Sequence, residues 1–514
     1  MGESKVHVVL VPLLGQGHLI PFMELAQLLA SQHLSISYIT TPKRVERLQP
    51  QVQGSNLDID LVSLLLPPID GVPPGMDSKD EIPFHVAEIL FSSSHKLAGP
   101  FEQWLDGQMN NIKAPNSFPP PVCIISEIYT GWVHSSGAKF GIPTVVFHTY
   151  GAFAMSVMHS LFTYMPHNSV EGDDEYFGVP ELSFDLKLRK SDLLVKLRHP
   201  NSYPLEGFVR EEIKQSMEGW GILINTFYDL DSLGIDHMRN LTGRPVWSIG
   251  PILPPAVFDD RGIDHESMNS RGKAADIAEE ECLKWLDTRS PQSVVFVCFG
   301  SHCILNEKQI RAVAVGLEAS GQAFIWAIKC LHTETKPKGT DVGLPEGFKE
   351  RTRERGLLIW GWAPQLLILS HPSVGAFLSH CGWNSTLESV SLAVPMITWP
   401  MFAEQPFNSK FLVEKLGIGI QICLDMSSVA NEEDVRRAVT MLLAEEEGKN
   451  MRRRAQELRK LGKIAIDKAG SGSSYTNLKC FVQEMQQLQA ARNDVKGVVT
   501  VTDLSIVESC SFHL

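Results

Sequence analysis

The sequence predicts an α/β fold of two domains, each built on a parallel β-sheet. Short apolar runs rich in Val, Ile, Leu and Phe alternate along the chain with stretches whose apolar residues recur at helical spacing. The 514 residues exceed what one hydrophobic core ordinarily holds. A polar, proline-bearing stretch at 251–280 divides the series in two. We therefore expect α/β domains at 1–250 and 281–470, joined by a linker at 251–280.

The first strand and helix place a histidine at a ligand-binding edge. The β-rich run Val6–Val11 ends at Pro12, and helical spacing begins at 20–30. His18 lies between them, where parallel sheets bind ligands, although a histidine there can equally cap the helix. Glu127 ends a later strand, and its position alone indicates only an ordinary exposed acid. The other strands expected in this half are 34–41, 56–65, 121–127, 143–149, 221–226 and 246–251.

Two segments of the N-terminal half are expected to contact a second ligand. The stretch 67–75 contains too much proline and glycine for regular structure, and a helix is expected at 84–97.

The C-terminal series then begins with a strand at 293–299, which leads into the turn Gly300-Ser301, a possible phosphate cradle. The later strands are expected at 324–328, 356–360, 376–380 and 394–399, and the helices at 306–317, 384–390, 432–468 and 475–491. Residues 495–514 could form a strand or an unstructured tail.

Composition excludes several classes of function. A formal net charge of -13 gives no basic surplus for binding nucleic acid or an anionic membrane. Nine cysteines, an odd number without metal-ligand spacing, are typical of reduced thiols in a cytosolic protein. The apolar run at 6–14 is broken by Pro12, so the amino end resembles neither a signal peptide nor a membrane span. We expect a cytoplasmic monomer with no metal and no cofactor.

The stretch 362–405 concentrates the side chains that recognise a nucleotide sugar. Trp362 ends a strand and offers a flat face to a nucleobase, while Glu388 can accept two ribose hydroxyls. A turn and a helix N-terminus follow the strand 376–380, an arrangement that binds phosphate through backbone N–H groups. The polar side chains that could assist are His380, Asn384 and Ser385 near the phosphate and Glu404 and Gln405 near the sugar. The pattern indicates a nucleotide-sugar pocket at the carboxyl ends of parallel strands.

This stretch closely resembles the signature box of the plant UDP-dependent glycosyltransferases that act on small secondary metabolites. The resemblance extends from Val6 to roughly Ala491 and is strongest at 362–405. It implies two Rossmann-like domains facing across a cleft, the GT-B type, with the acceptor on the N-terminal domain and the UDP-sugar on the C-terminal domain. It further implies that a final helix at 471–494 packs back on the N-terminal domain. Ala393 stands where the family usually has glycine.

The resemblance also assigns roles to the donor-site residues. It implies that Trp362 stacks on uracil, that the Ala363 backbone and Gln365 hold the base and ribose region, and that Glu388 binds the ribose hydroxyls. In the family a final glutamine in the box is associated with UDP-glucose. The residues expected at the diphosphate are Ser301, His380, Asn384 and Ser385, and those expected at the sugar are Trp383, Glu404 and Gln405. From its place at the end of the strand 143–149, Thr149 or Tyr150 is also expected to face the sugar.

The catalytic residues come from the N-terminal half. By resemblance His18, within Gly15-Gln16-Gly17-His18 and followed by Pro21, is the catalytic base of an inverting glycosyltransferase. Glu127, with Trp132 shortly after it, stands where the family has an aspartate that partners the histidine. The extra methylene lets the carboxylate reach His18 only if the backbone or the rotamer compensates. The pair favours a working transferase over the alternatives, a nucleotide-sugar-binding protein without activity or a UDP-sugar hydrolase. Phenolics, flavonoids, terpenoids and hormones all remain open as acceptors.

Overall fold

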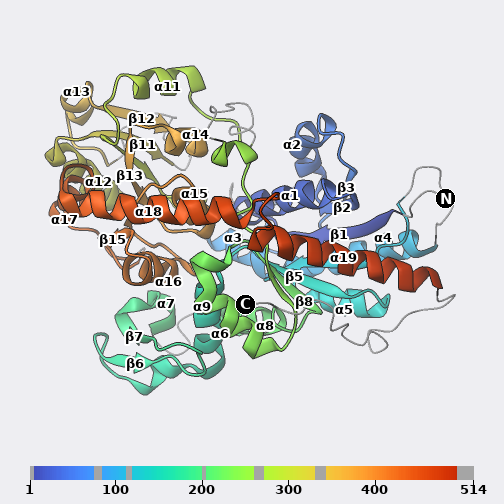
Figure 1. The fold of residues 1–514 in the computed structure, drawn as a ribbon. Coiled ribbons are helices and arrows are strands. Elements are labelled where there is room, and N and C mark those ends of the chain that lie inside the picture. The colour runs from blue at the N-terminus through green and yellow to red at the C-terminus, as the bar shows by residue number, and fades with distance from the viewer. Residues whose placement is uncertain are drawn as a thin grey trace.

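The computed structural model describes residues 5–73, 84–110, 118–198, 204–259, 271–329, 343–425 and 427–494. These residues form two α/β lobes, with the N-terminal strands in one and the C-terminal strands in the other (Figure 1). Every strand pair within the two large sheets is parallel. The two-domain parallel α/β fold expected from the sequence is therefore confirmed. None of the described helices is both long enough and apolar enough to cross a membrane.

The N-terminal sheet contains seven strands in the order β3-β2-β1-β4-β5-β8-β9. Their bounds are β1 Val6–Val11, β2 Leu34–Thr40, β3 Ile59–Ser63, β4 Cys123–Glu127, β5 Thr144–His148, β8 Gly221–Ile224 and β9 Val246–Ser248. The chain order reverses between β1 and β4, which are direct neighbours, so their carboxyl ends form a switch point of the kind that binds ligands. This geometry brings the residues after β1 and the last residue of β4 to one edge.

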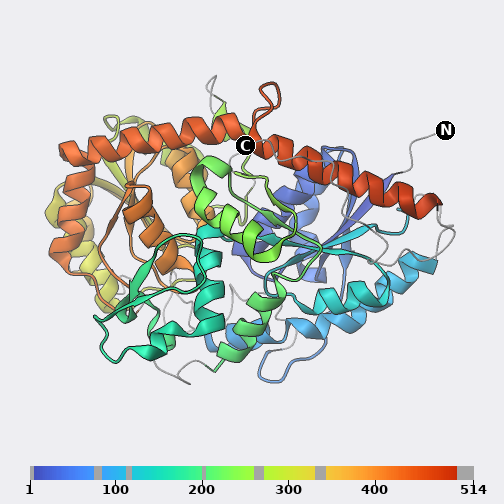
Figure 2. The same cartoon turned by 60° about the horizontal axis from the view of Figure 1, so that its bottom comes forward.

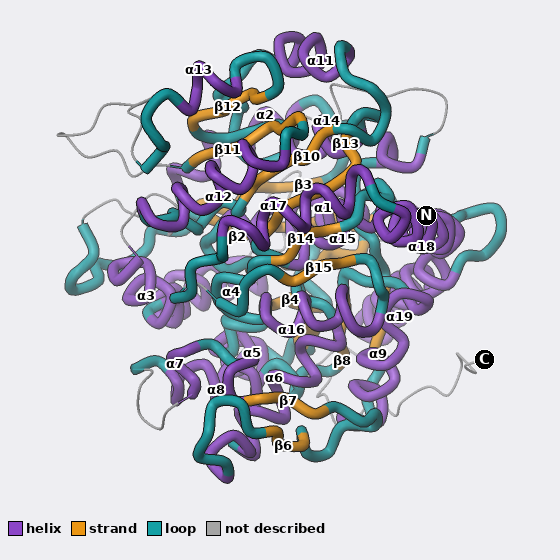
Figure 3. Tube along the Cα trace, turned by 90° about the vertical axis from the view of Figure 1, so that its left-hand side faces the viewer, coloured by secondary structure: helices purple, strands orange, loops and turns teal. Residues whose placement is uncertain are grey.

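The C-terminal sheet contains six strands in the order β12-β11-β10-β13-β14-β15. Their bounds are β10 Val294–Cys298, β11 Ala323–Ile328, β12 Gly356–Trp360, β13 Val374–Ser379, β14 Met396–Thr398 and β15 Gly419–Gln421. Figure 3 views the chain from the side of this sheet, which lies among helices. The interiors of β10, β11, β13 and β14 are buried on both faces, as expected of parallel strands covered by helices, while the edge strands β12 and β15 are partly exposed. A separate antiparallel hairpin pairs β6, Tyr176–Gly178, with β7, Lys187–Arg189.

Helices connect the strands of both sheets. The N-terminal helices are α1 Gln16–Ala30, α2 Pro42–Gln53, α3 Phe84–Ser92, α4 Ala98–Asn110, α5 Trp132–Lys139, α6 Ala152–Tyr164, α7 Val195–Arg198, α8 Glu206–Gln215 and α9 Tyr228–Thr242. The later helices are α11 Glu279–Asp287, α12 Glu307–Ser320, α13 Phe348–Thr352, α14 Gln365–Ser370, α15 Trp383–Ser391, α16 Gln405–Lys410, α17 Glu432–Ala444, α18 Glu446–Ala465 and α19 Ser473–Asp494. The 3-10 segments are η1 Ser94–Leu97, η2 Pro166–Ser169, η3 Lys190–Asp192 and η4 Pro255–Phe258, and η5 Phe411–Lys415 is a π-helix.

Some helix bounds differ from the sequence-based expectation. The structure begins α1 at Gln16, four residues before the apolar spacing does, because Gly15 is extended and acts as the N-cap. The single helix expected at 84–97 ends at Ser92, whose hydroxyl bonds back to the carbonyls of the preceding turn. The helical region expected at 432–468 is two helices, because Glu445 is extended. Ala393 has a φ of 58°, the left-handed conformation that favours the family's glycine.

The last helix returns to the N-terminal lobe. Figures 1 and 2 show α18 lying along the C-terminal lobe and α19 continuing across to β1 and β9. Leu478, Phe481 and Met485 of α19 are buried in the same hydrophobic core as β1, and the Asn477 amide donates to the Ser248 carbonyl at 3.0 Å. This part of the chain therefore completes the core of the N-terminal sheet. Residues 495–514, for which the sequence left two alternatives, lie outside the described residues.

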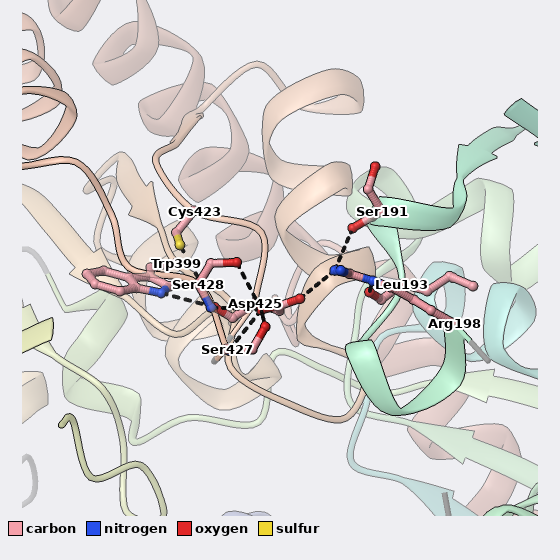
Figure 4. A network of polar contacts seen from close by, with 8 residues as sticks. All are labelled: Ser191, Leu193, Arg198, Trp399, Cys423, Asp425, Ser427 and Ser428. Carbon is pink, nitrogen blue, oxygen red and sulfur yellow. Dashed lines mark hydrogen bonds and ion pairs between the residues drawn. The ribbon is translucent and has the colours of Figure 1, made fainter. Parts of the chain in front are cut away.

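The two lobes also contact each other away from the strand ends. Arg198, which follows the β6–β7 hairpin, donates to an Asp425 carboxylate oxygen of the C-terminal lobe at 2.5 Å (Figure 4). The other Asp425 oxygen accepts four bonds, two from Ser427 and two from Ser428. Close by, the rings of Phe153 and Phe411 stack with centroids 4.8 Å apart. The Arg198–Asp425 ion pair thus joins the two lobes, and serines of the Asp425 loop hold the carboxylate in place.

Candidate active site

The catalytic pair expected from the sequence is in contact. His18 lies in the first turn of α1, just after β1, and Glu127 is the last residue of the neighbouring strand β4. The imidazole Nδ1 lies 2.8 Å from Glu127 Oε1. Both residues are buried, with 6% of His18 and 1% of Glu127 exposed. The switch point between β1 and β4 therefore assembles a histidine and a carboxylate into one hydrogen-bonded unit.

A tight turn after β4 accommodates the extra methylene of Glu127. Its second carboxylate oxygen accepts the backbone N–H of Tyr129 at 2.8 Å. The Thr130 hydroxyl accepts the Glu127 N–H at 2.9 Å and donates to the Glu127 carbonyl at 3.0 Å. The side chain thus folds back over its own turn, so that one oxygen is fixed by the backbone and the other faces His18. The compensation that the sequence required is present.

Thr149, which is expected at the sugar, also belongs to this hydrogen-bonded network. Its hydroxyl donates to Glu127 Oε1 at 3.2 Å and lies 3.3 Å from His18 Nδ1. Only 2% of the residue is exposed. Thr149 comes directly after β5, which pairs with β4, and this places its hydroxyl beside Glu127. Thr149 thus gives the glutamate oxygen a second donor.

Aromatic rings lie around His18, the histidine expected to be the catalytic base. The Tyr129 and Tyr150 rings have centroids 6.4 and 6.1 Å from that of His18, and they lie 6.1 Å from each other. Phe91, from the helix after the proline-rich loop, meets Tyr129 edge-on at 4.9 Å and Phe208 at 5.1 Å. Edge-to-face contacts of this kind form apolar surfaces suited to flat or lipophilic molecules. The N-terminal side of the site is therefore lined by aromatic residues.

Two turns that each contain a glycine, Gly300 and Gly382, pack against His380 in the region where the diphosphate is expected. A Cβ added at Gly300 or at Gly382 would lie 2.6 Å from the His380 ring. Burial lowers the pKa of His380 to about 4, so at neutral pH the ring is a neutral hydrogen-bond donor. The Lys329 ammonium donates to the carbonyl of Ser301 in the first turn. Ser301, His380 and a lysine that the sequence did not single out thus lie together.

The helix expected to bind phosphate begins one residue earlier, at Trp383. Gly382 precedes it in extended conformation, and no side chain caps the first turn of α15. Ser385, in this turn, accepts the Gln365 amide at 3.0 Å. The backbone N–H groups at the start of α15 therefore have no capping side chain, the arrangement that an anion completes.

Two residues of the box, Trp383 and Asn384, contact the backbone of the N-terminal lobe. The Trp383 indole donates to the Asn225 carbonyl at 2.7 Å and packs against Gly151, and the Asn384 amide donates to the Gly17 carbonyl at 2.8 Å. The roles expected for Trp383 at the sugar and for Asn384 at the diphosphate stay predictions. The start of α15 lies against the N-terminal lobe, so these side chains reach its backbone.

The residues expected to recognise uridine lie together, and residues of the expected linker contact them. The Trp362 N–H donates to Asp276 and the Trp362 carbonyl accepts the Asp276 N–H, both at 2.8 Å. The Gln365 amide donates to Glu388 Oε2 at 2.5 Å, and Arg271 donates to Glu388 Oε1. Ala363, next to the tryptophan, is buried and its carbonyl accepts the N–H of Gln365 at 2.9 Å. The base and ribose residues thus form one connected group.

Glu404 and Gln405 lie at the start of α16. The Gln405 side-chain oxygen accepts the N–H groups of Met401 and Phe402, both at 3.0 Å. The Asn408 amide donates to a Glu404 oxygen at 3.2 Å, which ties the acid to the helix. Because the oxygen of Gln405 is committed to the backbone, its amide nitrogen is the group suited to donate to a sugar hydroxyl.

Sequence reasoning missed Glu24 and Arg271, which are both buried beside the donor residues. The available signals were an acid within the apolar spacing of the first helix and an arginine-glycine pair at the end of the polar linker. Among the described residues no cluster of three or more His, Cys, Asp or Glu side chains could hold a metal ion.

Comparisons with known proteins agree with this site. A family model described as UDP-glucoronosyl and UDP-glucosyl transferase matches residues 265–460, and one described as glycosyltransferase, N-terminal domain, matches residues 4–114. The scopoletin glucosyltransferase of Nicotiana tabacum is 35% identical, and the alignment covers 94% of this chain and 98% of that protein. The anthocyanin 3'-O-beta-glucosyltransferase of Gentiana triflora is 34% identical over the same shares.

Solved structures show the same architecture. A Glycyrrhiza uralensis UGT complexed with glycyrrhetinic acid 3-O-monoglucuronide superposes with a TM-score of 0.81 at 30% identity, covering 96% of this chain and 98% of that one. Phytolacca americana UGT2, complexed with UDP-2fluoro-glucose and pterostilbene, gives 0.73 at 26% identity, covering 94% and 100%. With a paired histidine and carboxylate facing a nucleotide-sugar box across two parallel α/β lobes, the chain belongs to the plant UDP-glycosyltransferases of secondary metabolism, enzymes of GT-B fold that transfer a sugar from a UDP-sugar to a small acceptor.

Proposed function

We propose that this enzyme transfers glucose from UDP-glucose to a lipophilic acceptor with inversion at the anomeric carbon, and that His18 is the catalytic base. The observation that carries the proposal is the 2.8 Å contact between His18 Nδ1 and Glu127 Oε1. A carboxylate on Nδ1 fixes the tautomer and the ring orientation, so that Nε2 takes a proton from the acceptor. Glu127 then stabilises the imidazolium that forms.

The reaction is a single displacement. As His18 Nε2 removes the acceptor proton, the acceptor oxygen bonds to the anomeric carbon and the bond from that carbon to the diphosphate oxygen breaks. UDP leaves with the electron pair of the broken bond, from the face opposite the attack, so the configuration inverts. Ser301, His380 and the N–H groups at the start of α15 already form a donor set for the departing charge, which supports stabilisation without reorganisation. The mechanism requires no metal and no other cofactor.

We assign the residues that bind the UDP-sugar from the signature box at 362–405. Residues 281–470 bind the UDP-sugar, with Trp362 against uracil, Gln365 and Glu388 at the ribose, and Glu404 with Gln405 at the sugar. The glutamine amide supports glucose as the preferred sugar. Residues 1–250 bind the acceptor, 251–280 link the domains and 471–494 form the returning helix.

The acceptor is a small lipophilic molecule with an aromatic or fused-ring body. The rings of Phe91, Tyr129 and Tyr150 lie next to the catalytic histidine, which supports phenolics, flavonoids or terpenoids. Relatives named for scopoletin and anthocyanin also favour phenolic acceptors. We further propose that the enzyme is a cytoplasmic monomer, since each of the seven described cysteines is a free thiol.

The test is an acceptor and donor screen read by product mass. UDP-glucose should give products one hexose heavier with phenolic or terpenoid acceptors, at a higher rate than UDP-galactose or UDP-glucuronic acid and without loss in EDTA. Proton NMR of the new anomeric signal should show the β configuration from α-linked UDP-glucose. Release of free glucose at the same rate with and without acceptor would instead identify a hydrolase.

A further inference from the structure

A buried arginine from the linker joins the two lobes at the uridine residues. The Arg271 guanidinium forms a forked ion pair with Glu24 of α1, with Nη2 donating to Oε2 at 2.9 Å and Nε paired with the other oxygen. Its remaining nitrogen, Nη1, donates to Glu388 Oε1. Only 11% of the Arg271 side chain is exposed. One cation thus bridges a carboxylate of the N-terminal lobe and the carboxylate assigned to the ribose.

The next residue covers the tryptophan assigned to uracil. Gly272 has a φ of 79°, and a Cβ added there would lie 2.6 Å from Cζ2 of the Trp362 indole and 3.3 Å from Ile20. Only glycine therefore fits between the indole and α1. The reciprocal 2.8 Å bonds between Asp276 and the Trp362 backbone fix the end of this segment. The pair Arg271-Gly272 consequently contacts both residues that should recognise uridine.

Both carboxylate oxygens of Glu388 are already engaged by the chain. One of its oxygens holds Arg271 and the other accepts the Gln365 amide at 2.5 Å, and 7% of its side chain is exposed. Two ribose hydroxyls would need these same oxygens. Arg271 would keep two bonds to Glu24 if it left Glu388, so the cation would remain neutralised by the N-terminal lobe.

We propose that Arg271 is an internal partner that holds Glu388 in the absence of donor, and that the ribose of the UDP-sugar displaces Arg271 from Glu388 while its fork with Glu24 stays closed. The inference rests on the proposed function, because it takes Glu388 and Trp362 as uridine residues. Donor binding then exchanges an internal ion pair for ribose hydrogen bonds. The measured donor affinity is lowered by the fraction of the enzyme in which Arg271 holds Glu388.

The test compares UDP with 2′,3′-dideoxy-UDP on the wild-type enzyme and on the double variant Glu24→Gln/Arg271→Gln. The double substitution removes the cation and its N-terminal partner together, so that Glu24 is not left as an unpaired carboxylate, and Glu388 keeps the bond from the Gln365 amide. Calorimetry should show UDP binding about three- to tenfold more tightly to the double variant, because the competitor is gone. The dideoxy nucleotide has no hydroxyls for Glu388, and its affinity should not change.

Three results would overturn the displacement: weaker UDP binding in the double variant, equal gains for both nucleotides, or no change for either. Weaker binding would show that the guanidinium contacts the donor itself. Arg198→Gln is the matched control, since it also removes a buried interdomain arginine, and it should leave both affinities at the wild-type level. A thermal melt of each variant verifies folding before binding is measured.

A separate variant tests whether Glu388 binds the ribose at all. Glu388→Gln alone should weaken UDP and leave the dideoxy nucleotide unaffected. If it binds UDP as tightly as the wild type does, Glu388 is not the ribose residue, and the proposed donor site is wrong whatever the double variant shows.

Discussion

The two halves of the active site differ in what their side chains hold before any substrate is bound. On the N-terminal side, His18, Glu127 and Thr149 bond to one another, and the spare glutamate oxygen is fixed by a backbone N–H. On the C-terminal side, the donor residues bond to groups that a nucleotide sugar would have to replace, as Glu388 does with Arg271.

The contacts on the N-terminal side preorganise groups for the reaction, whereas those on the C-terminal side stabilise a site that holds no ligand. Hydrogen bonds that orient a base need no change during the reaction, so they contribute to kcat. Internal partners of a ligand site keep its buried polar groups satisfied, and breaking them offsets part of the binding free energy. Substitutions in the first half should therefore change kcat, and substitutions in the second should change donor affinity.

The largest effect should come from His18→Ala. Removing the base should lower kcat by about 10³-fold, within the usual range for a general base. The affinity for UDP, measured by calorimetry, should stay the same because no donor residue is altered. A variant that retains its turnover would show that another group removes the proton.

The next largest effect should come from Glu127. Glu127→Gln keeps the shape but loses the charge that stabilises imidazolium, and should lower kcat about 100-fold. Glu127→Asp keeps the charge but cannot reach both the Tyr129 N–H and His18, and should lower kcat about tenfold. Steady-state kinetics at saturating donor measures both. Wild-type turnover in the aspartate variant would show that the longer side chain is incidental in this enzyme.

On the donor side, a substitution is expected to change the affinity for UDP and not kcat. Glu388→Gln should raise the Kd for UDP about tenfold, equivalent to about 1.4 kcal/mol, because an amide accepts the ribose hydroxyls less well than a carboxylate does. At saturating UDP-glucose kcat should change little. If kcat falls instead while Kd holds, Glu388 acts in the transition state and the contrast between the halves is wrong.

The smallest effect on the site should come from the other interdomain arginine. Arg198→Met leaves Asp425 with its four serine bonds, and should cost about 2 kcal/mol of unfolding free energy, less than breaking a buried pair usually costs. Thermal melting should detect the loss. The UDP affinity should remain within about twofold of wild type. A large change in affinity would show that the two arginines act together in closing the lobes.

The sequence was most informative where local pattern decides structure. The apolar runs predicted β1 to within its observed bounds, and β10 and β12 to within two residues at each end, because buried parallel strands are continuously hydrophobic. Helix α6 was not predicted, since nearly all its residues are buried and it lacks a polar face to mark a helical period. The π-helix η5 and the β6–β7 hairpin were missed for want of a distinct local signal.

At the site, the sequence predicted which residues matter better than what each one contacts. The His18 and Glu127 pair was expected, but whether the longer acid reaches the ring depends on the turn to Thr130. Trp383 and Thr149 were assigned to the sugar, and their side chains also contact protein groups. Arg271 was treated as part of a plain linker, because its position between Glu24 and Glu388 is fixed only when both lobes are folded.

The returning helix α19 affects the order in which parts of the protein can fold during synthesis. Phe481 and Met485 share a core with strands that leave the ribosome more than 400 residues earlier. Until the last helix has been synthesised, the N-terminal sheet exposes the apolar face that these residues will cover, a state prone to aggregation. The N-terminal half is therefore synthesised first, but its hydrophobic core is completed last. Its exposed apolar face is where a chaperone would be needed during synthesis.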